Sequence, residues 1–188
     1  EGTSVHPLSA EMVGMSVCTK VGKAYYIPFG HKTGEPQLTR EQVIGYMKPL
    51  LEDMSIEKYL HHAKFDALMF STIGISLENV TFDTMIAASL ALEDGERIGL
   101  KSLSENYLNE PMTSFKDVVY KKYPDFSYVP IQPATEYAAA DAHQTMALVP
   151  IMKRLLEEKG LLSLFLDLEM PVMNVLTRME RAGIQLDM

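Results

Sequence analysis

The chain of 188 residues contains 47% hydrophobic and 22% charged side chains, which is enough apolar material for one ordinary domain with a buried core. This composition excludes disordered and collagen-like proteins, and a single cysteine, Cys18, excludes an internal disulfide. The net charge of −8 argues against a general nucleic-acid-binding protein, because such proteins usually carry a basic stripe.

The first third of the chain predicts a β-hairpin followed by a helix. Residues 12–18 and 24–29 are expected to be its two strands, joined by a turn that contains a glycine. At Thr39 the spacing of apolar residues becomes helical. Thr39 and Gln42 have the spacing of a capping box, which predicts a helix that begins there.

The rest of the chain predicts strands and helices that alternate. Short strands are expected at residues 59–62 and 80–82. Helices are expected at residues 66–71, 83–92, 100–108, 115–120, 135–159 and 161–181. Early strands with helices interleaved later predict an α/β fold, in which helices cover a sheet. No apolar stretch reaches the roughly 20 residues of a membrane-spanning helix, so no membrane partner is expected.

Asp66 stands where a predicted strand gives way to a helix. Carboxylates at the ends of strands often line the cleft of an α/β sheet. Aspartate is also a favoured N-cap residue, so the local sequence leaves a site carboxylate and a helix cap as alternatives. Asp83 opens the next helix and is expected to be a cap or anchor. His61 and His62 are adjacent in a predicted strand, so they point apart and are not expected to share a metal ion.

A second candidate lies on the long helix predicted at residues 135–159. Tyr137 and Asp141 are four residues apart, which places the phenol and the carboxylate on one face, one turn apart. Three alanines separate them, and their small size lets the helix approach a sheet or a substrate closely. An ordinary surface pair of tyrosine and aspartate is the alternative.

Together these segments resemble the 3′→5′ proofreading exonuclease domain of family A DNA polymerases. That family has an Asp-x-Glu strand, an Asn-x-x-x-Asp segment and a Tyr-x-x-x-Asp helix, in this order. Residues 137–141 match the third block. Residues 62–66 match the second, with His62 where the family usually has asparagine, and Glu1 resembles the glutamate of the first. Further similar segments occur at residues 13–16, 26–28, 82–85, 100–103 and 169–183.

The resemblance implies a ribonuclease H-like fold: a mixed β-sheet of about five strands, flanked by helices. Residues 1–160 would form the exonuclease domain, and residues 161–188 would form a helix that leads into a polymerase domain of the same chain. The implied protein is a monomer of the bacterial cytoplasm or nucleoid.

The resemblance also implies a two-metal site. Glu1, Asp66 and Asp141 would hold two divalent ions, Mg²⁺ or Mn²⁺, with Zn²⁺ possible at one position. Tyr137 would orient the attacking water, and nucleoside 5′-monophosphates would leave from a DNA 3′ end. The family's first aspartate would lie two residues before Glu1, outside this sequence, so little nuclease activity is expected from this chain alone.

Substrate contacts are implied for Gly2, Val5, His62, Arg97 and Phe115, with single-stranded DNA as the partner. Core packing is the alternative for Val5 and Phe115, and a solvated loop charge for Arg97. The departure at His62 leaves the role of that side chain open. Two other functions remain as alternatives: an RNA-processing exonuclease of the ribonuclease D kind, and an inactive exonuclease fold that only scaffolds a polymerase.

Overall fold

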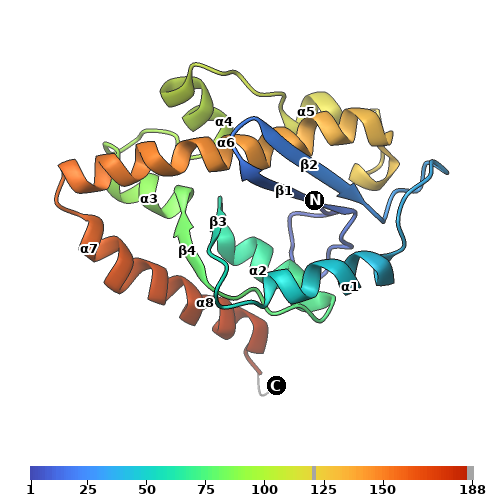
Figure 1. The fold of residues 1–188 in the computed structure, drawn as a ribbon, viewed down its shortest axis with the longest axis horizontal. Coiled ribbons are helices and arrows are strands. Elements are labelled where there is room, and N and C mark those ends of the chain that lie inside the picture. Colours follow the sequence, from blue (N-terminus) through green and yellow to red (C-terminus); the bar gives the residue numbers. More distant parts are fainter. Residues whose placement is uncertain (120–121, 186–188) are drawn as a thin grey trace.

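The computed structural model describes residues 1–119 and 122–185, and it has an α/β fold with two small β-ladders (Figure 1). One ladder is an antiparallel hairpin and the other is a parallel pair. The strands are β1 (Gly14–Lys20), β2 (Lys23–Pro28), β3 (Lys58–Leu60) and β4 (Val80–Asp83). The predicted α/β class is confirmed. In the part of the chain that is described, the strands form two two-stranded sheets rather than one sheet of five.

Helices make up most of the remaining structure. They are α1 (Arg40–Leu51), α2 (Ala63–Thr72), α3 (Thr84–Ala91), α4 (Leu100–Leu103), α5 (Phe115–Val118), α6 (Ile131–Glu158), α7 (Leu162–Leu164) and α8 (Met170–Ala182). π-Helical turns at Ser104–Leu108 and Phe165–Glu169 extend α4 and join α7 to α8. The predicted helices at 100–108 and 161–181 are therefore continuous coils with a wider turn inside each. Residue 120, the predicted end of the short helix, lies outside the described residues.

The capping residues explain where two of these helices begin. The Thr39 side chain accepts a hydrogen bond from the backbone N–H of Gln42, and the Gln42 side chain accepts one from the backbone N–H of Thr39. This is the predicted capping box at the start of α1. Asp83 caps α3 by accepting from the backbone N–H groups of Met85 and Ile86. Both caps satisfy donors that have no partner inside the helix.

The hairpin lies between α1 and α6. On one face, Met15 packs with Val43 of α1 and Met69 of α2. On the other face, Tyr26, which is adjacent to Ile27, the cross-strand partner of Met15, packs with α6. Val13, just before β1, belongs to the same cluster. This two-sided burial follows from the alternation of side chains along a strand. The hairpin is therefore a fixed platform for the N-terminal part of α6.

Gly14 makes room for the buried ring of Tyr26. A Cβ atom at Gly14 would lie 2.3 Å from the Tyr26 hydroxyl oxygen. That hydroxyl is 2.8 Å from Nε2 of His31, whose Nδ1 is 2.8 Å from the backbone oxygen of Val129. The missing side chain at Gly14 thus allows a polar chain of contacts to join the hairpin to the segment that leads into α6.

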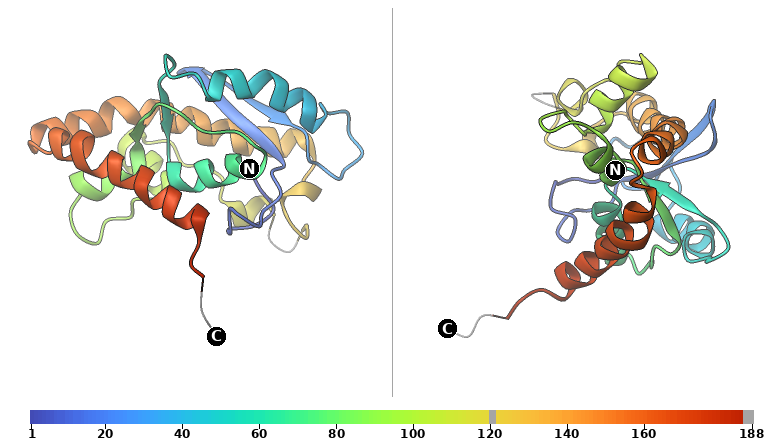
Figure 2. Two further views of the ribbon diagram at one scale, coloured as in Figure 1. Left: turned by 90° about the horizontal axis from the view of Figure 1, so that it is seen from below. Right: turned by 90° about the vertical axis from the view of Figure 1, so that its left-hand side faces the viewer.

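The C-terminal half has a core of its own, in which α3, α6 and α8 meet around Phe82 and Phe165. Both views in Figure 2 show α8 beside α2, with the chain leaving the body of the molecule after α8. No single helix in the described ranges is long and apolar enough to span a membrane; α6 with residues Leu162–Ala182 meets that test only as a pair bent by 119°.

Candidate active site

Asp66 lies in the first turn of α2, which begins one position after His62. The N-cap is therefore His62, and the alternative that Asp66 merely caps the helix is wrong. His62 adopts a left-handed backbone conformation with φ of 71°. Asparagine and histidine both enter this region more readily than most residues, so a histidine is compatible with this backbone at the position where the resemblance predicts asparagine. This exposed side chain lies 5.7 Å, ring centre to ring centre, from Phe65.

The buried carboxylate of Asp83 fixes the turn that presents Asp66. It accepts hydrogen bonds from the backbone N–H groups of His62 (3.2 Å) and Ala63 (2.6 Å), in addition to those at the start of α3. One side chain therefore ties together the first turns of α2 and α3. Because Asp66 follows three residues after Ala63, its backbone is positioned by this anchor. The expectation that Asp83 is a structural anchor is confirmed.

Tyr137 and Asp141 lie one turn apart on α6. Between them, Ala138 is completely buried and packs on the hairpin residues Val13 and Tyr26. The small alanines were expected to let the helix approach a sheet or a substrate, and α6 approaches the β1–β2 hairpin. Tyr137 and Asp141 are themselves only partly exposed, so the alternative of an ordinary surface pair does not hold.

Glu1 and Gly2 lie against the start of β1. The backbone oxygen of Glu1 accepts from the N–H of Val13 (2.9 Å), and Gly2 pairs with Met12 in an isolated antiparallel bridge. A Cβ atom at Gly2 would lie 2.6 Å from the terminal methyl carbon of Met69, so the absence of a side chain lets the chain pass close to α2. This pairing fixes Glu1 next to the start of β1, with Gly2 close to α2.

The carboxylates act on one another electrostatically. Burial raises the pKa of Asp66 to about 7, and the negative charges of Glu1, Asp83 and Asp141 contribute to the increase. Burial likewise raises the pKa of Asp141 to about 6; Glu1 adds to this increase while Lys101 opposes it. The three predicted ligands therefore share one region of negative potential, in which an additional cation is favoured.

Tyr137 sits in an aromatic cluster beside these acids. Its ring centre is 5.7 Å from that of Phe126 and 6.4 Å from that of Phe115. Burial raises the pKa of the Tyr137 hydroxyl, and the charges of Asp141 and Glu1 raise it further. The phenol consequently stays protonated at any physiological pH, so it can orient a water molecule but cannot act as a base.

The residues predicted to contact substrate are exposed, except for Gly2, which is partly buried. Phe115 is 44% exposed and stacks on Phe126, while Val5, in the loop after Gly2, is 80% exposed. Core packing is therefore wrong as the explanation for Val5 and for the open face of Phe115. Arg97 lies exposed in the loop between α3 and α4. A DNA contact by these residues remains a prediction.

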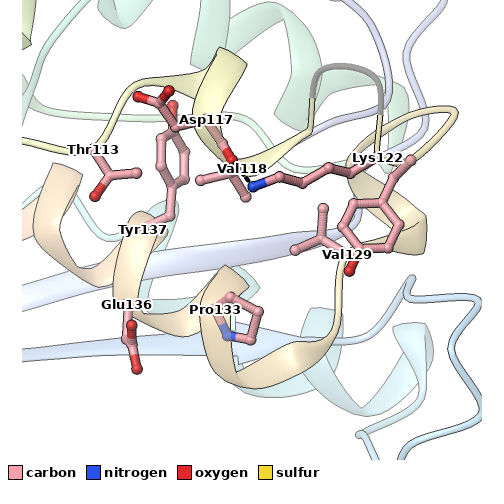
Figure 3. A pocket seen from close by; sticks show the side chains of 9 residues that line it. Thr113, Asp117, Val118, Lys122, Val129, Pro133, Glu136 and Tyr137 are labelled. Carbon is pink, nitrogen blue, oxygen red and sulfur yellow. Dashed lines mark hydrogen bonds between the residues drawn. The ribbon is translucent and has the colours of Figure 1, made fainter.

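A pocket of about 240 Å³ borders the site between the α5 segment and the first turns of α6, and Figure 3 shows the side chains that line it. Tyr137 forms part of its wall. Opposite, the Lys122 ammonium donates to the backbone oxygen of Asp117, which closes the α5 turn. The pocket thus lies between the α5 segment and α6, next to Tyr137.

His61 and His62 diverge, as expected for adjacent residues at a strand end. The Nδ1 atom of His61 is 2.9 Å from the Thr84 hydroxyl, and its buried Nε2 has no hydrogen-bond partner among the described residues. Burial lowers the pKa of His61 to about 4, so the ring is neutral near pH 7. His61 is therefore a core contact between β3 and α3.

Lys101 of α4 is the site residue that the sequence did not reveal. Its Nζ atom is 3.0 Å from Oδ1 of Asp141 and 4.5 Å from the ring centre of Tyr137. Forty positions separate Lys101 from Asp141, and no local spacing links them. The only sequence signal was the similarity of residues 100–103 to a family segment.

The donor set suits a hard divalent cation, because every predicted ligand atom is a carboxylate oxygen. Within residues 1–119 and 122–185, however, no three acidic, histidine or cysteine side chains are gathered closely enough to form a ready-made metal site. The Asp141 carboxylate is instead paired with Lys101. The residues fit a metal, with some movement of side chains.

Comparison with known proteins agrees with this geometry. A family model described as 3′–5′ exonuclease matches residues 1–157. DNA polymerase I of Chloroflexus aurantiacus is 38% identical over 192 residues, and the match covers 100% of this chain and 20% of the relative. DNA polymerase I of Pseudomonas aeruginosa is 36% identical over 194 residues, covering 100% and 21%. The chain thus spans about a fifth of the length of these curated relatives.

Solved structures share the fold. The POL domain of Pol1 from M. smegmatis, in complex with DNA primer-template and dNTP, superposes with a TM-score of 0.75 at 24% identity, covering 100% of this chain and 28% of that one. Brucella melitensis NrnC with bound Mg²⁺ superposes with a TM-score of 0.69 at 22% identity, covering 100% and 87%. At these identities the likeness shows the architecture alone.

Proposed function

Because the chain belongs to the 3′–5′ exonuclease family, we propose that it is the metal-dependent proofreading domain of a DNA polymerase I. It would hydrolyse the last phosphodiester bond of a DNA 3′ end and release nucleoside 5′-monophosphates. One observation carries this proposal: Asp66 and Asp141, from two different helices, both have a raised pKa that the charge of Glu1 increases, and Tyr137 stands beside them. Buried carboxylates with raised pKa values beside a tyrosine are consistent with the acidic site that a cation-dependent nuclease requires.

Glu1, Asp66 and Asp141 would hold two divalent ions, Mg²⁺ or Mn²⁺, with Zn²⁺ possible at one position. When bound, such ions activate a water molecule as the nucleophile and stabilise the charge that develops on the phosphate. The protein's own contribution is positional. The Asp83 anchor holds the turn before Asp66, and the buried Ala138 holds Asp141 against the hairpin.

Tyr137 would orient the attacking water through its hydroxyl group. Its raised pKa keeps the proton on the phenol. The neutral hydroxyl group can therefore donate one hydrogen bond and accept another. The packing of its ring on Phe126 limits the positions that the hydroxyl can take. We therefore expect Tyr137→Phe to lower kcat while leaving metal affinity unchanged.

The substrate would be a single-stranded DNA 3′ end. Phe115 offers an open aromatic face next to Tyr137, on which an unpaired base can stack, and Val5 offers an exposed apolar side chain on the loop after Glu1. Gly2 would present its backbone, and Arg97 would contact phosphate. For His62 we propose that the left-handed backbone matters more than the ring.

We also propose a wider setting for the domain. A strand leading into Glu1 would continue the pairing of Gly2 with Met12, and with β1–β4 it would make the ribonuclease H-like sheet of about five strands. Residues 1–160 would form the exonuclease domain. Residues 161–188, of which 186–188 lie outside the described residues, would lead into a polymerase domain of the same chain. We propose a monomer in the bacterial cytoplasm or nucleoid.

The test is a nuclease assay on two forms of the chain. One is the chain itself; the other carries an N-terminal β-strand of about six residues that ends in Asp-x directly before Glu1. Each is incubated with a 5′-labelled single-stranded oligonucleotide and Mg²⁺ or Mn²⁺. We expect stepwise shortening from the 3′ end by the extended form, little by the chain itself, and none after Asp66→Ala. An extended form with Asn-x in place of Asp-x is the matched control.

The same assay separates the two alternatives. An oligoribonucleotide degraded faster than DNA would favour an RNA-processing exonuclease of the ribonuclease D kind. An extended form that is folded and inert on both would favour the scaffolding role. An inactive scaffold would not need to retain its catalytic residues. The presence of Asp66, Tyr137 and Asp141 therefore favours an active nuclease over the scaffolding role.

A further inference from the structure

Lys101 makes contact with both functional residues of α6. From the second position of α4, its ammonium group lies 3.0 Å from the Asp141 carboxylate and 4.5 Å above the centre of the Tyr137 ring. An ammonium so close to an aromatic face is held by the ring as well as by the carboxylate. Lys101 is thus fixed at two points within the proposed site.

This ion pair differs from the others that the described residues form. The side chains of Lys101 and Asp141 are 30% and 25% exposed. In each of the other five pairs at least one side chain is 45% exposed or more; Lys159 and Glu93, for example, are 40% and 82% exposed. Partial burial weakens the screening by water, so the Lys101–Asp141 attraction is stronger than that of a surface pair.

We infer that Lys101 is a tethered cation that neutralises Asp141 in the metal-free protein and competes with the divalent ion for that carboxylate. The inference rests on the proposed function, because it takes Asp141 as a metal ligand. An ammonium and a divalent cation at one carboxylate repel each other, so binding of the metal must displace or strain the lysine. The flexible four-carbon stem of lysine permits such a displacement.

Competition of this kind has a specific consequence for metal affinity. Removing the ammonium group makes the acidic site more negative by one charge. Metal binding at Asp141 then no longer requires the ion pair with Lys101 to be broken. Lys101→Met retains most of the apolar stem while deleting the charge. Since an ion pair of about 1 kcal/mol corresponds to about a fivefold change in a binding constant, we expect Lys101→Met to bind Mn²⁺ about three- to tenfold more tightly.

The test is Mn²⁺ titration by isothermal calorimetry, carried out on the chain and on its extended form, with no nucleic acid present. Lys101→Arg keeps the charge and should leave the Kd within about twofold of the wild type. Lys159→Met, which breaks the pair with Glu93 elsewhere on the surface, is the matched control and should leave the Kd unchanged. Thermal unfolding of each metal-free variant shows whether it is folded.

An unchanged or weaker Mn²⁺ affinity in folded Lys101→Met would overturn the inference, because it would mean that the lysine supports the metal-binding form of Asp141. If Lys101→Met does not fold, Lys101→Gln takes its place with the same expected gain. The double variant Lys101→Met/Asp141→Asn should bind no more tightly than Asp141→Asn alone, and a gain that persists there would also count against competition at Asp141. If wild-type Mn²⁺ binding survives Asp66→Ala, the proposed metal site fails as well.

Discussion

Replacing Asp66 by asparagine should change how the stability of the metal-free chain depends on pH. In an unfolded chain an aspartate has a pKa of about 3.9. In the folded chain burial and neighbouring carboxylates raise the pKa of Asp66 to about 7. Between those values the folded state binds more protons than the unfolded state, so the free energy of unfolding falls as the pH rises from about 4 to about 7. Asparagine has no proton to lose, so it removes this fall.

The magnitude follows from the difference between the two pKa values. At about 1.4 kcal/mol per pKa unit, the full difference corresponds to about 4 kcal/mol. Asp66 is partly exposed and shares its field with Asp141, so we expect about half of this, roughly 2 kcal/mol, between pH 5 and pH 8. Asp66→Asn should thus become more stable relative to the wild type by about 2 kcal/mol over that range.

Urea unfolding followed by circular dichroism, with a chelator present, measures the effect at pH 5, 6, 7 and 8. The comparison with the wild type is essential, because the lowered pKa of buried His61 makes stability rise with pH and partly hides the fall due to Asp66. Asp94→Asn, in the exposed loop after α3, makes the same chemical change at the surface and is the matched control. A stability difference between Asp66→Asn and the wild type that is the same at pH 5 and pH 8 would refute the reasoning.

Further substitutions test the scaffold and the substrate surface. Asp83→Ala removes a buried acceptor of four backbone N–H groups and should lower the free energy of unfolding in urea by about 2–4 kcal/mol. Gly14→Ala places a Cβ atom 2.3 Å from the Tyr26 hydroxyl and should lower it by about 1–3 kcal/mol. Gly45→Ala, in an open position of α1, should by contrast raise it by up to about 1 kcal/mol. Phe115→Ala should increase the KM of the extended form for single-stranded DNA several-fold, with little loss of stability. Phe115→Tyr, which keeps an aromatic ring, should have a KM close to that of the wild type. An unchanged KM in Phe115→Ala would show that Phe115 does not contact the substrate.

Local sequence signals predicted most helices and strands, because their causes are local. The capping box at Thr39 and the cap at Asp83 fix two helix starts within a few residues of chain. The start of α6 was predicted at residue 135, whereas the helix begins at Ile131. Pro133 explains the difference: proline is tolerated in the first turn of a helix, where its missing N–H needs no partner, so it does not delay the start.

The site was predictable only where its residues fall within one segment. The spacing of Tyr137 and Asp141 is a helical repeat and can be read directly. The choice between a cap and a site carboxylate at Asp66 needed the structure, because it depends on the left-handed turn at His62 and on the distant anchor Asp83. Lys101 was missed for the same reason, since its contact with Asp141 is made by the packing of two helices and leaves no local pattern.

The acidic composition acquires a different meaning once the positions of the charges are known. A net charge of −8 argues against nucleic-acid binding only if the charges act as a uniform surface, since repulsion of the phosphate backbone is then general. Here burial is the main factor that opposes the ionisation of Asp66 and Asp141, so their ionisation lowers folding stability. A cation that neutralises these carboxylates binds the folded state and therefore stabilises the fold. Metal binding and folding stability are thus linked. The same linkage would make affinity for a DNA 3′ end depend on divalent ions, because they reverse the local charge while leaving the rest of the acidic surface unchanged.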